Sequence, residues 1–93
     1  MEPDLEADVI RGRRAAELQG DEVLQAAHSQ IEADLLQSLL TSPQRDKEGQ
    51  LELVALLKLN RRYRESLRRT IEQGKVATER LSFLKRVQRR FAA

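Results

Sequence analysis

Residues 50–73 form the longest uninterrupted helical pattern in the chain, without a proline or a glycine. Apolar side chains recur there in alternating steps of four and three residues, which is a helix period, because a strand would alternate every second residue. The positions on this ladder are Leu53, Leu57, Asn60, Arg64, Leu67 and Ile71. Gly74 follows, where a glycine commonly ends a helix. The pattern therefore predicts one long helix that the other segments pack against.

Two shorter amphipathic segments precede it. The first predicts a helix over 5–19, weakened by Gly12. Gly20 and Asp21 then predict a C′ glycine followed directly by the N-cap of the next helix. That second helix should span about 22–40, with an apolar stripe at Leu24, Ala27, Ile31, Leu35 and Leu39.

A short turn separates the second helix from the long one. Pro43 stops the second helix, and either Ser42 or Asp46 can cap the third. A short connection between two amphipathic helices predicts an antiparallel hairpin, here over about 22–40 and 44–73.

Beyond Gly74 the helical pattern resumes with many cations. It predicts a basic C-terminal helix over about 76–91, or else a continuation of the long helix through Gly74, since a helical glycine costs only about 1 kcal/mol. The predicted fold is therefore all-α, in a single domain over 1–93 with a frayed segment at 1–4.

A core built from this composition is thin. Of the 93 residues only Tyr63, Phe83 and Phe91 are aromatic, and tryptophan is absent. Chains of this size commonly gain stability by oligomerising, so we expect a homo-oligomer. Cysteine is absent, which rules out disulfides and thiolate metal sites. There is no apolar run of membrane-spanning length and the first residues are acidic, so we expect no signal peptide and a cytoplasmic location in the host cell.

Charge is divided unevenly along the chain. Residues 1–60 carry 6 Lys and Arg against 12 Asp and Glu, whereas residues 61–93 carry 11 against 3. Such a division lets protomers meet head to tail, or offers a basic end to an acidic partner. Two solvated helix faces are the simpler interpretation.

Few polar residues fall on the apolar faces. Asn60 lies on the ladder, where a polar side chain can fix register and oligomeric state, unless it faces water at the edge. Arg64 should extend its guanidinium outward from the same ladder. His28 is the only histidine, and without cysteines or paired carboxylates it predicts no metal site. No nucleophile lies at a suggestive spacing from a base, so we expect no enzyme and no cofactor.

Two surfaces stand out as candidates for binding. The expected oligomer interface comprises Leu53, Leu57, Asn60, Leu67, Ile71, Leu24, Ile31 and Leu35. The expected basic surface, for a partner or for DNA, comprises Arg61, Arg68, Lys85, Arg86, Arg89 and Arg90. Arginine-rich helices bind phosphate backbones, but without aromatic residues between the cations any DNA binding should be weak and non-specific. The turn around Gly20 is a poor helix-turn-helix, because acidic residues begin the next helix.

Three segments give the chain a resemblance to a known class of proteins. These are RGRRAAEL (Arg11–Leu18), RDKEGQLEL (Arg45–Leu53) and EQGKVATERL (Glu72–Leu81). In their order and spacing they resemble short helical proteins encoded among the assembly genes of tailed phages, prophages and gene transfer agents. The aromatic residues that such proteins carry before the polar loop are replaced here by leucines.

The hairpin is also similar to the oligomerisation core of small terminase subunits. That resemblance implies a ring-forming adaptor that recruits the large terminase, or contacts the portal protein, during DNA packaging. The N-terminal DNA-binding domain of that family has no counterpart here. The leading hypothesis is a non-catalytic oligomer in virion assembly, and the alternative is a helical protein–protein interaction or structural module with no DNA role.

Overall fold

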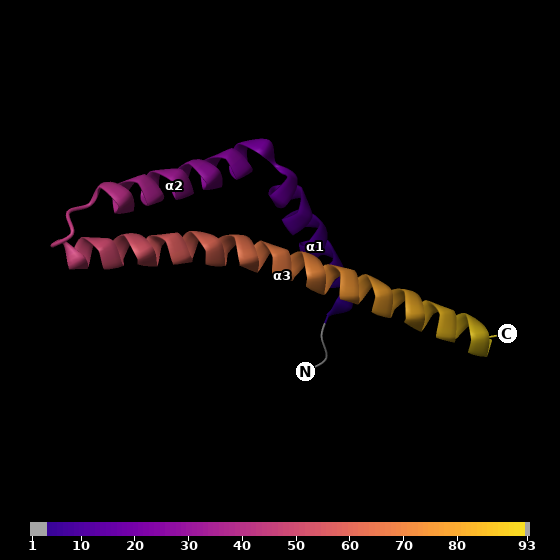
Figure 1. Cartoon of the computed structure of the whole chain (residues 1–93). Helices are drawn as coiled ribbons and strands as arrows, with labels where there is room; N and C mark the ends of the chain where they lie inside the picture. Colours follow the sequence, from indigo (N-terminus) through magenta and orange to yellow (C-terminus); the bar gives the residue numbers. More distant parts are fainter. Residues whose placement is uncertain (1–3, 93) are drawn as a thin grey trace. The chain divides into compact units, whose positions relative to one another are not determined.

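The computed structural model describes residues 4–92, which form three α-helices and no strand (Figure 1). The helices are α1 (Leu5–Gly20), α2 (Glu22–Thr41) and α3 (Lys47–Ala92). The predicted all-α fold is confirmed. Of the segment predicted to be frayed, residues 1–3 lie outside the described residues.

An aspartate caps the N-terminus of each helix. The Asp4 carboxylate accepts a hydrogen bond from the Ala7 amide at 3.0 Å, and the Asp21 carboxylate accepts one from the Leu24 amide at 3.0 Å. For α3 the cap is Asp46, whose carboxylate accepts from the Gly49 amide at 3.0 Å. Each bond satisfies an amide that lacks an intrahelical partner. Asp46 rather than Ser42 therefore starts the long helix.

Two glycines behave differently from the sequence-based prediction. α3 runs through Gly74 without interruption, so the separate basic helix over 76–91 does not exist. Gly20 is the last residue of α1 rather than a residue beyond it. No described glycine has a positive φ, which is the conformation that a C′ glycine adopts. The continuation through Gly74 is the correct alternative.

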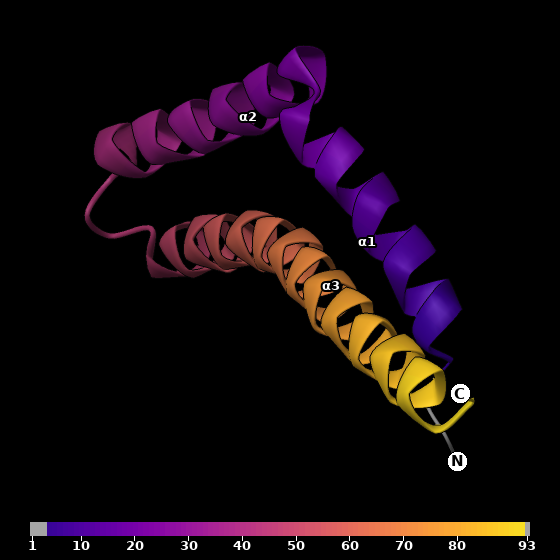
Figure 2. The ribbon, with the colours of Figure 1, turned by 90° about the vertical axis from the view of Figure 1, so that its right-hand side faces the viewer.

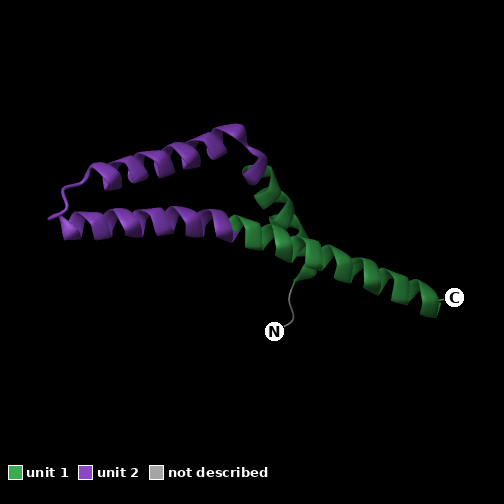
Figure 3. Cartoon of the chain, viewed as in Figure 1, with its two compact units in different colours: residues 1–18, 67–93 green, residues 19–66 purple. Residues whose placement is uncertain are grey.

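Two compact units divide the described residues (Figure 3). The hairpin unit is Gln19–Ser66 and contains α2 with the first part of α3. The crossing unit consists of the described residues up to Leu18 and from Leu67 onward, and contains α1 with the second part of α3.

Very little apolar surface is buried. Among the described residues only Ala15 and Ala77 are buried apolar side chains, at 4% and 1% exposure, and both belong to the crossing unit. Large apolar side chains that remain exposed include Val23, Leu40, Leu51, Leu59, Phe83 and Phe91. Complete burial of a leucine or phenylalanine contributes about 1.5–3 kcal/mol, so most of this stabilisation is unrealised in the single chain. Exposed apolar surface on this scale suggests packing against another molecule.

None of the helices within residues 4–92 combines the length and apolar character needed to cross a membrane.

Candidate interaction surfaces

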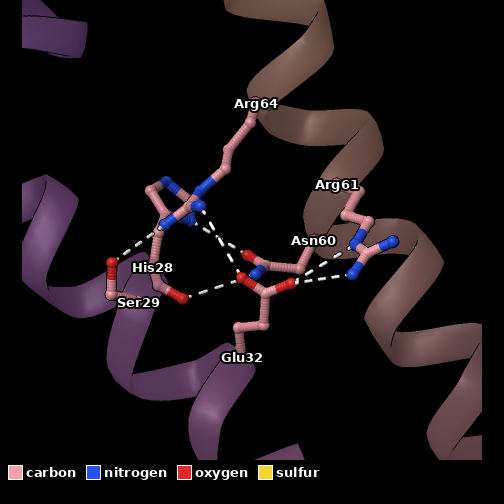
Figure 4. A network of polar contacts seen from close by, with 6 residues as sticks. All are labelled: His28, Ser29, Glu32, Asn60, Arg61 and Arg64. Carbon is pink, nitrogen blue, oxygen red and sulfur yellow. Dashed lines mark hydrogen bonds and ion pairs between the residues drawn. The ribbon is translucent and has the colours of Figure 1, made fainter. Parts of the chain in front are cut away.

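The two helices of the hairpin unit meet through a polar cluster at mid-length (Figure 4). Asn60 of α3 contacts His28 of α2 twice, since its Oδ1 lies 3.0 Å from the His28 Nδ1 and its Nδ2 donates to the His28 carbonyl at 3.4 Å. The amide oxygen can only accept, so the His28 proton resides on Nδ1 in this arrangement. The pair sets one residue of α2 directly against one residue of α3.

Ion pairs flank this contact. The Glu32 carboxylate accepts from the Arg61 Nε at 3.3 Å and Nη2 at 3.2 Å. Arg64 approaches the same carboxylate at 3.8 Å and donates to the Ser29 hydroxyl at 3.3 Å. Because the Arg64 guanidinium contacts Ser29 and Glu32 of α2 and its Nε is buried, it does not extend outward as expected. Exposed pairs of this kind contribute about 0–1 kcal/mol each, so they orient the helices more than they stabilise them.

His28 is the only buried residue of α2 and sits at the edge of an apolar groove. Its ring lies 5.0 Å from the Tyr63 ring, centroid to centroid. The Nε2 of His28 is buried without a hydrogen-bond partner among the described residues. The apolar groove is lined by Ile31, Leu35, Leu56, Leu59 and Tyr63, with His28 and Asn60 at its polar edge. Of its apolar members only Leu35 is less than 48% exposed, so the groove is an uncovered surface.

In the crossing unit, α1 lies beside the second part of α3 (Figure 2), and the two helix backbones come into close contact at Gly12 and Gly74. A Cβ built on Gly12 would lie 2.8 Å from the Gly74 Cα, and one built on Gly74 would lie 2.9 Å from the Gly12 Cα. Ala15 and Ala77 follow three residues after the two glycines and are buried beside them. Both glycines are thus required by the close contact between the helix backbones, and neither is a helix end.

The last turns of α3 carry four of the cations predicted to form the basic surface. Lys85, Arg86, Arg89 and Arg90 are all exposed. Within the described chain none of the four makes a hydrogen bond or an ion pair. Their positive charge is therefore available to another molecule.

The structure distributes the predicted interface residues over both units. In the hairpin unit Leu24, Leu35, Leu53 and Leu57 are half-buried, as is Asn60, and Ile31 is exposed in the apolar groove. In the crossing unit Leu67 is half-buried. Ile71 lines a recess with α1 residues that include Val9 and Ala16. The predicted interface leucines are thus partly covered within the single chain, whereas the exposed residues of the apolar groove are accessible to a partner.

The predicted basic residues also separate. Arg61 belongs to the hairpin unit and is engaged by Glu32, whereas Arg68 and the four cations of the last turns belong to the crossing unit. Arg68 is exposed and takes part in an interaction with another residue of the chain. Of the expected basic surface, only the four terminal cations lie close together on one helix and are all exposed.

Two features escaped the sequence-based prediction. The glycine crossing has a visible signal, because both helices carry Gly-x-x-Ala, at Gly12–Ala15 and at Gly74–Ala77. The second feature is the bond between His28 and Asn60, because the sequence does not predict that these two residues meet.

Comparisons with protein-family models, with characterised proteins and with solved structures find no match for this chain. Its function must therefore be inferred from its own surfaces.

Proposed function

We propose that this chain is a non-catalytic helical oligomer that acts as a small-terminase-like adaptor for DNA packaging in phage or prophage assembly. The observation that carries the proposal is the uncovered apolar groove of the hairpin unit, in a chain whose described residues include only two buried apolar side chains, both alanines. A second copy covering such a surface would supply the core that the single chain lacks.

The basic end of α3 supports the adaptor role. Four cations within six residues repel one another, and the helix dipole favours only those in the final turn. They are stabilised when they meet an acidic partner, which in a packaging complex is DNA or an acidic surface of the large terminase or the portal protein. The assignment to phage assembly is based on the resemblance of the sequence to phage assembly proteins.

A packaging assay tests this function directly. In a strain whose prophage encodes the chain, deletion of the gene should abolish nuclease-resistant DNA in the released particles, and a plasmid copy should restore it. Normal yields of DNA-filled particles after deletion would overturn the packaging role. If capsids are then also normal in number and the protein still forms a defined oligomer, the alternative of an interaction module without a DNA role is favoured.

A further inference from the structure

The last turns of α3 form a strongly amphipathic segment. Within Leu81–Phe91, the helical period places one set of side chains on an apolar face: Leu81, Phe83, Leu84, Val87 and Phe91. Lys85, Arg86, Arg89 and Arg90 occupy the opposite face, and the segment has no acidic residue. We refer to this segment as the basic tail.

The apolar face of the basic tail continues a contact that already exists in the chain. Gly74 and Ala77 pack against α1, and Leu81 and Leu84 lie one and two turns further along the same face of α3. Leu5, the first residue of α1, lies beside Ala77 and Arg80. In the basic tail Leu81 and Val87 are half-buried, whereas Leu84 is 48%, Phe83 59% and Phe91 84% exposed.

The apolar groove of the hairpin unit has the complementary chemistry. Glu52 lies one turn before Leu56, and Asp34 lies three residues after Ile31, so each carboxylate belongs to a helix face that borders the groove. Both side chains are exposed and neither makes an ion pair within residues 4–92. Glu32, in contrast, is neutralised by Arg61.

Charge favours contact between the tail of one copy and the groove of another. The hairpin unit, Gln19–Ser66, carries 6 Lys and Arg against 8 Asp and Glu, whereas the basic tail carries only cations. An amphipathic helix seated in an apolar groove is a recurrent mode of recognition, and flanking charges set its specificity.

We propose that the basic tail of one protomer docks in the apolar groove of a second protomer, which makes the self-association heterologous, or head to tail. This inference rests on the oligomer of the proposed function and specifies how that oligomer is built. DNA is the less suitable occupant of the tail, because phosphates would engage the cations and leave Leu84 and Phe91 in water. Repetition of such a contact generates a ring when the rotation closes.

Charge reversal tests the contact without altering the apolar residues. The tail variant is Lys85→Glu with Arg90→Glu; Lys85 follows Leu81 by one turn, and Arg90 borders the same recess as Phe83 and Val87. The groove variant is Asp34→Lys with Glu52→Lys. Each variant should self-associate about tenfold or more weakly than the wild type, because opposite charges at the contact become like charges.

Mixing the two variants provides the decisive result. The acidic tail of one variant meets the basic groove of the other, and the remaining pairing is wild-type, so an equimolar mixture should form oligomers again, with the wild-type mass when that oligomer has an even number of protomers. Native mass spectrometry should then find the two variants in a 1:1 ratio within these oligomers, because the variants must alternate. Circular dichroism of each variant alone checks that its helices are intact, and Arg13→Glu with Arg14→Glu is the control, since both arginines are exposed on α1 outside the proposed contact.

Several results would overturn the tail–groove contact. It fails if folded tail and groove variants assemble like the wild type, or if the mixture stays dissociated. It also fails if the tail variant loses binding to a duplex DNA probe but assembles normally, which would assign the tail to DNA. In the first and last of these cases the oligomer itself survives, whereas a wild type that is monomeric throughout would remove the proposed function as well.

Discussion

At the scale of single residues, the hairpin depends on a hydrogen bond that only the folded chain brings together. His28 and Asn60 are separated by 32 positions, and their side chains meet at 3.0 Å between the two helices. Without Asn60, neither ring nitrogen of His28 has a hydrogen-bond partner among the described residues. A buried polar group that loses its partner costs more free energy than the bond itself contributes.

Replacement of Asn60 tests this pair. Asn60→Leu should lower the free energy of unfolding by about 1–3 kcal/mol, because the Nδ1 proton of His28 is left without an acceptor. The double variant His28→Leu with Asn60→Leu should recover most of that loss, since both polar groups are gone. Urea denaturation of the four proteins in the cycle measures the coupling, and a double variant as unstable as the sum of the single ones would contradict it.

The glycine crossing allows a second residue-scale test with an internal control. Gly12→Ala should destabilise the protein by about 1–3 kcal/mol, because the new methyl group would lie 2.8 Å from the Gly74 backbone. Gly20→Ala should instead stabilise it by up to about 1 kcal/mol, since nothing lies within 4 Å of its Cβ position and alanine is the better helix former. Thermal denaturation compares them, and equal Tm shifts would refute the crossing.

At the scale of the elements, periodicity and the aspartate caps predicted the helices well, whereas glycine as a signal of a helix end predicted them poorly. The bounds expected for the first two helices, 5–19 and 22–40, differ by one residue at most from those of α1 and α2. At Gly74 the sequence leaves two alternatives, a helix end or a continuous helix, because a glycine signals an end only through its local context. Its actual role is set by Gly12, which lies far away in sequence.

Of the two candidate interaction surfaces, only one could be predicted from the sequence. The exposed cations of the last turns follow from composition and helical spacing alone. The apolar groove does not, because residues of both α2 and α3 line it, and the sequence alone does not show which residues of the two helices lie opposite each other. The interface expected from the sequence therefore lacks Leu56, Leu59 and Tyr63, although all three line the groove.

The basic end of α3 carries the prediction that belongs to this scale. Replacing Lys85, Arg86, Arg89 and Arg90 with glutamine should leave the helices folded and reduce DNA packaging in vivo. If the cations also contact DNA, binding of a duplex probe by the wild type should weaken with salt, and each lost phosphate contact should reduce the slope of log K against log salt concentration by about one. Unimpaired packaging by this variant would assign the cations to a solvated helix face.

At the scale of the whole molecule, the same sequence must serve two requirements. The chain needs enough internal contacts to form its helices, and it leaves apolar surface in both units for another molecule. Two alanines and a register pair meet the first requirement only in part. The exposed groove and tail are consistent with a protein whose stability depends on concentration, as it does for obligate oligomers.

The groove gives a prediction for the assembled protein. Leu59 is 62% exposed in the single chain, so Leu59→Asp would change little in a monomer. In an oligomer that covers the groove it should weaken assembly strongly, because a carboxylate would be buried without a partner. Leu51→Asp, at a 70% exposed position outside the groove, is the matched control and should assemble normally. Sedimentation velocity of both variants beside the wild type distinguishes the two cases.

The most direct test of self-association is the molar mass of the wild-type chain in solution as a function of concentration. Size-exclusion chromatography with multi-angle light scattering, over a hundredfold dilution series, should give a discrete oligomer larger than a dimer. Its thermal stability should fall on dilution, because folding and assembly share the same apolar surface. A folded monomer of about 10.7 kDa at every concentration, with an unchanged melting temperature, would contradict the account.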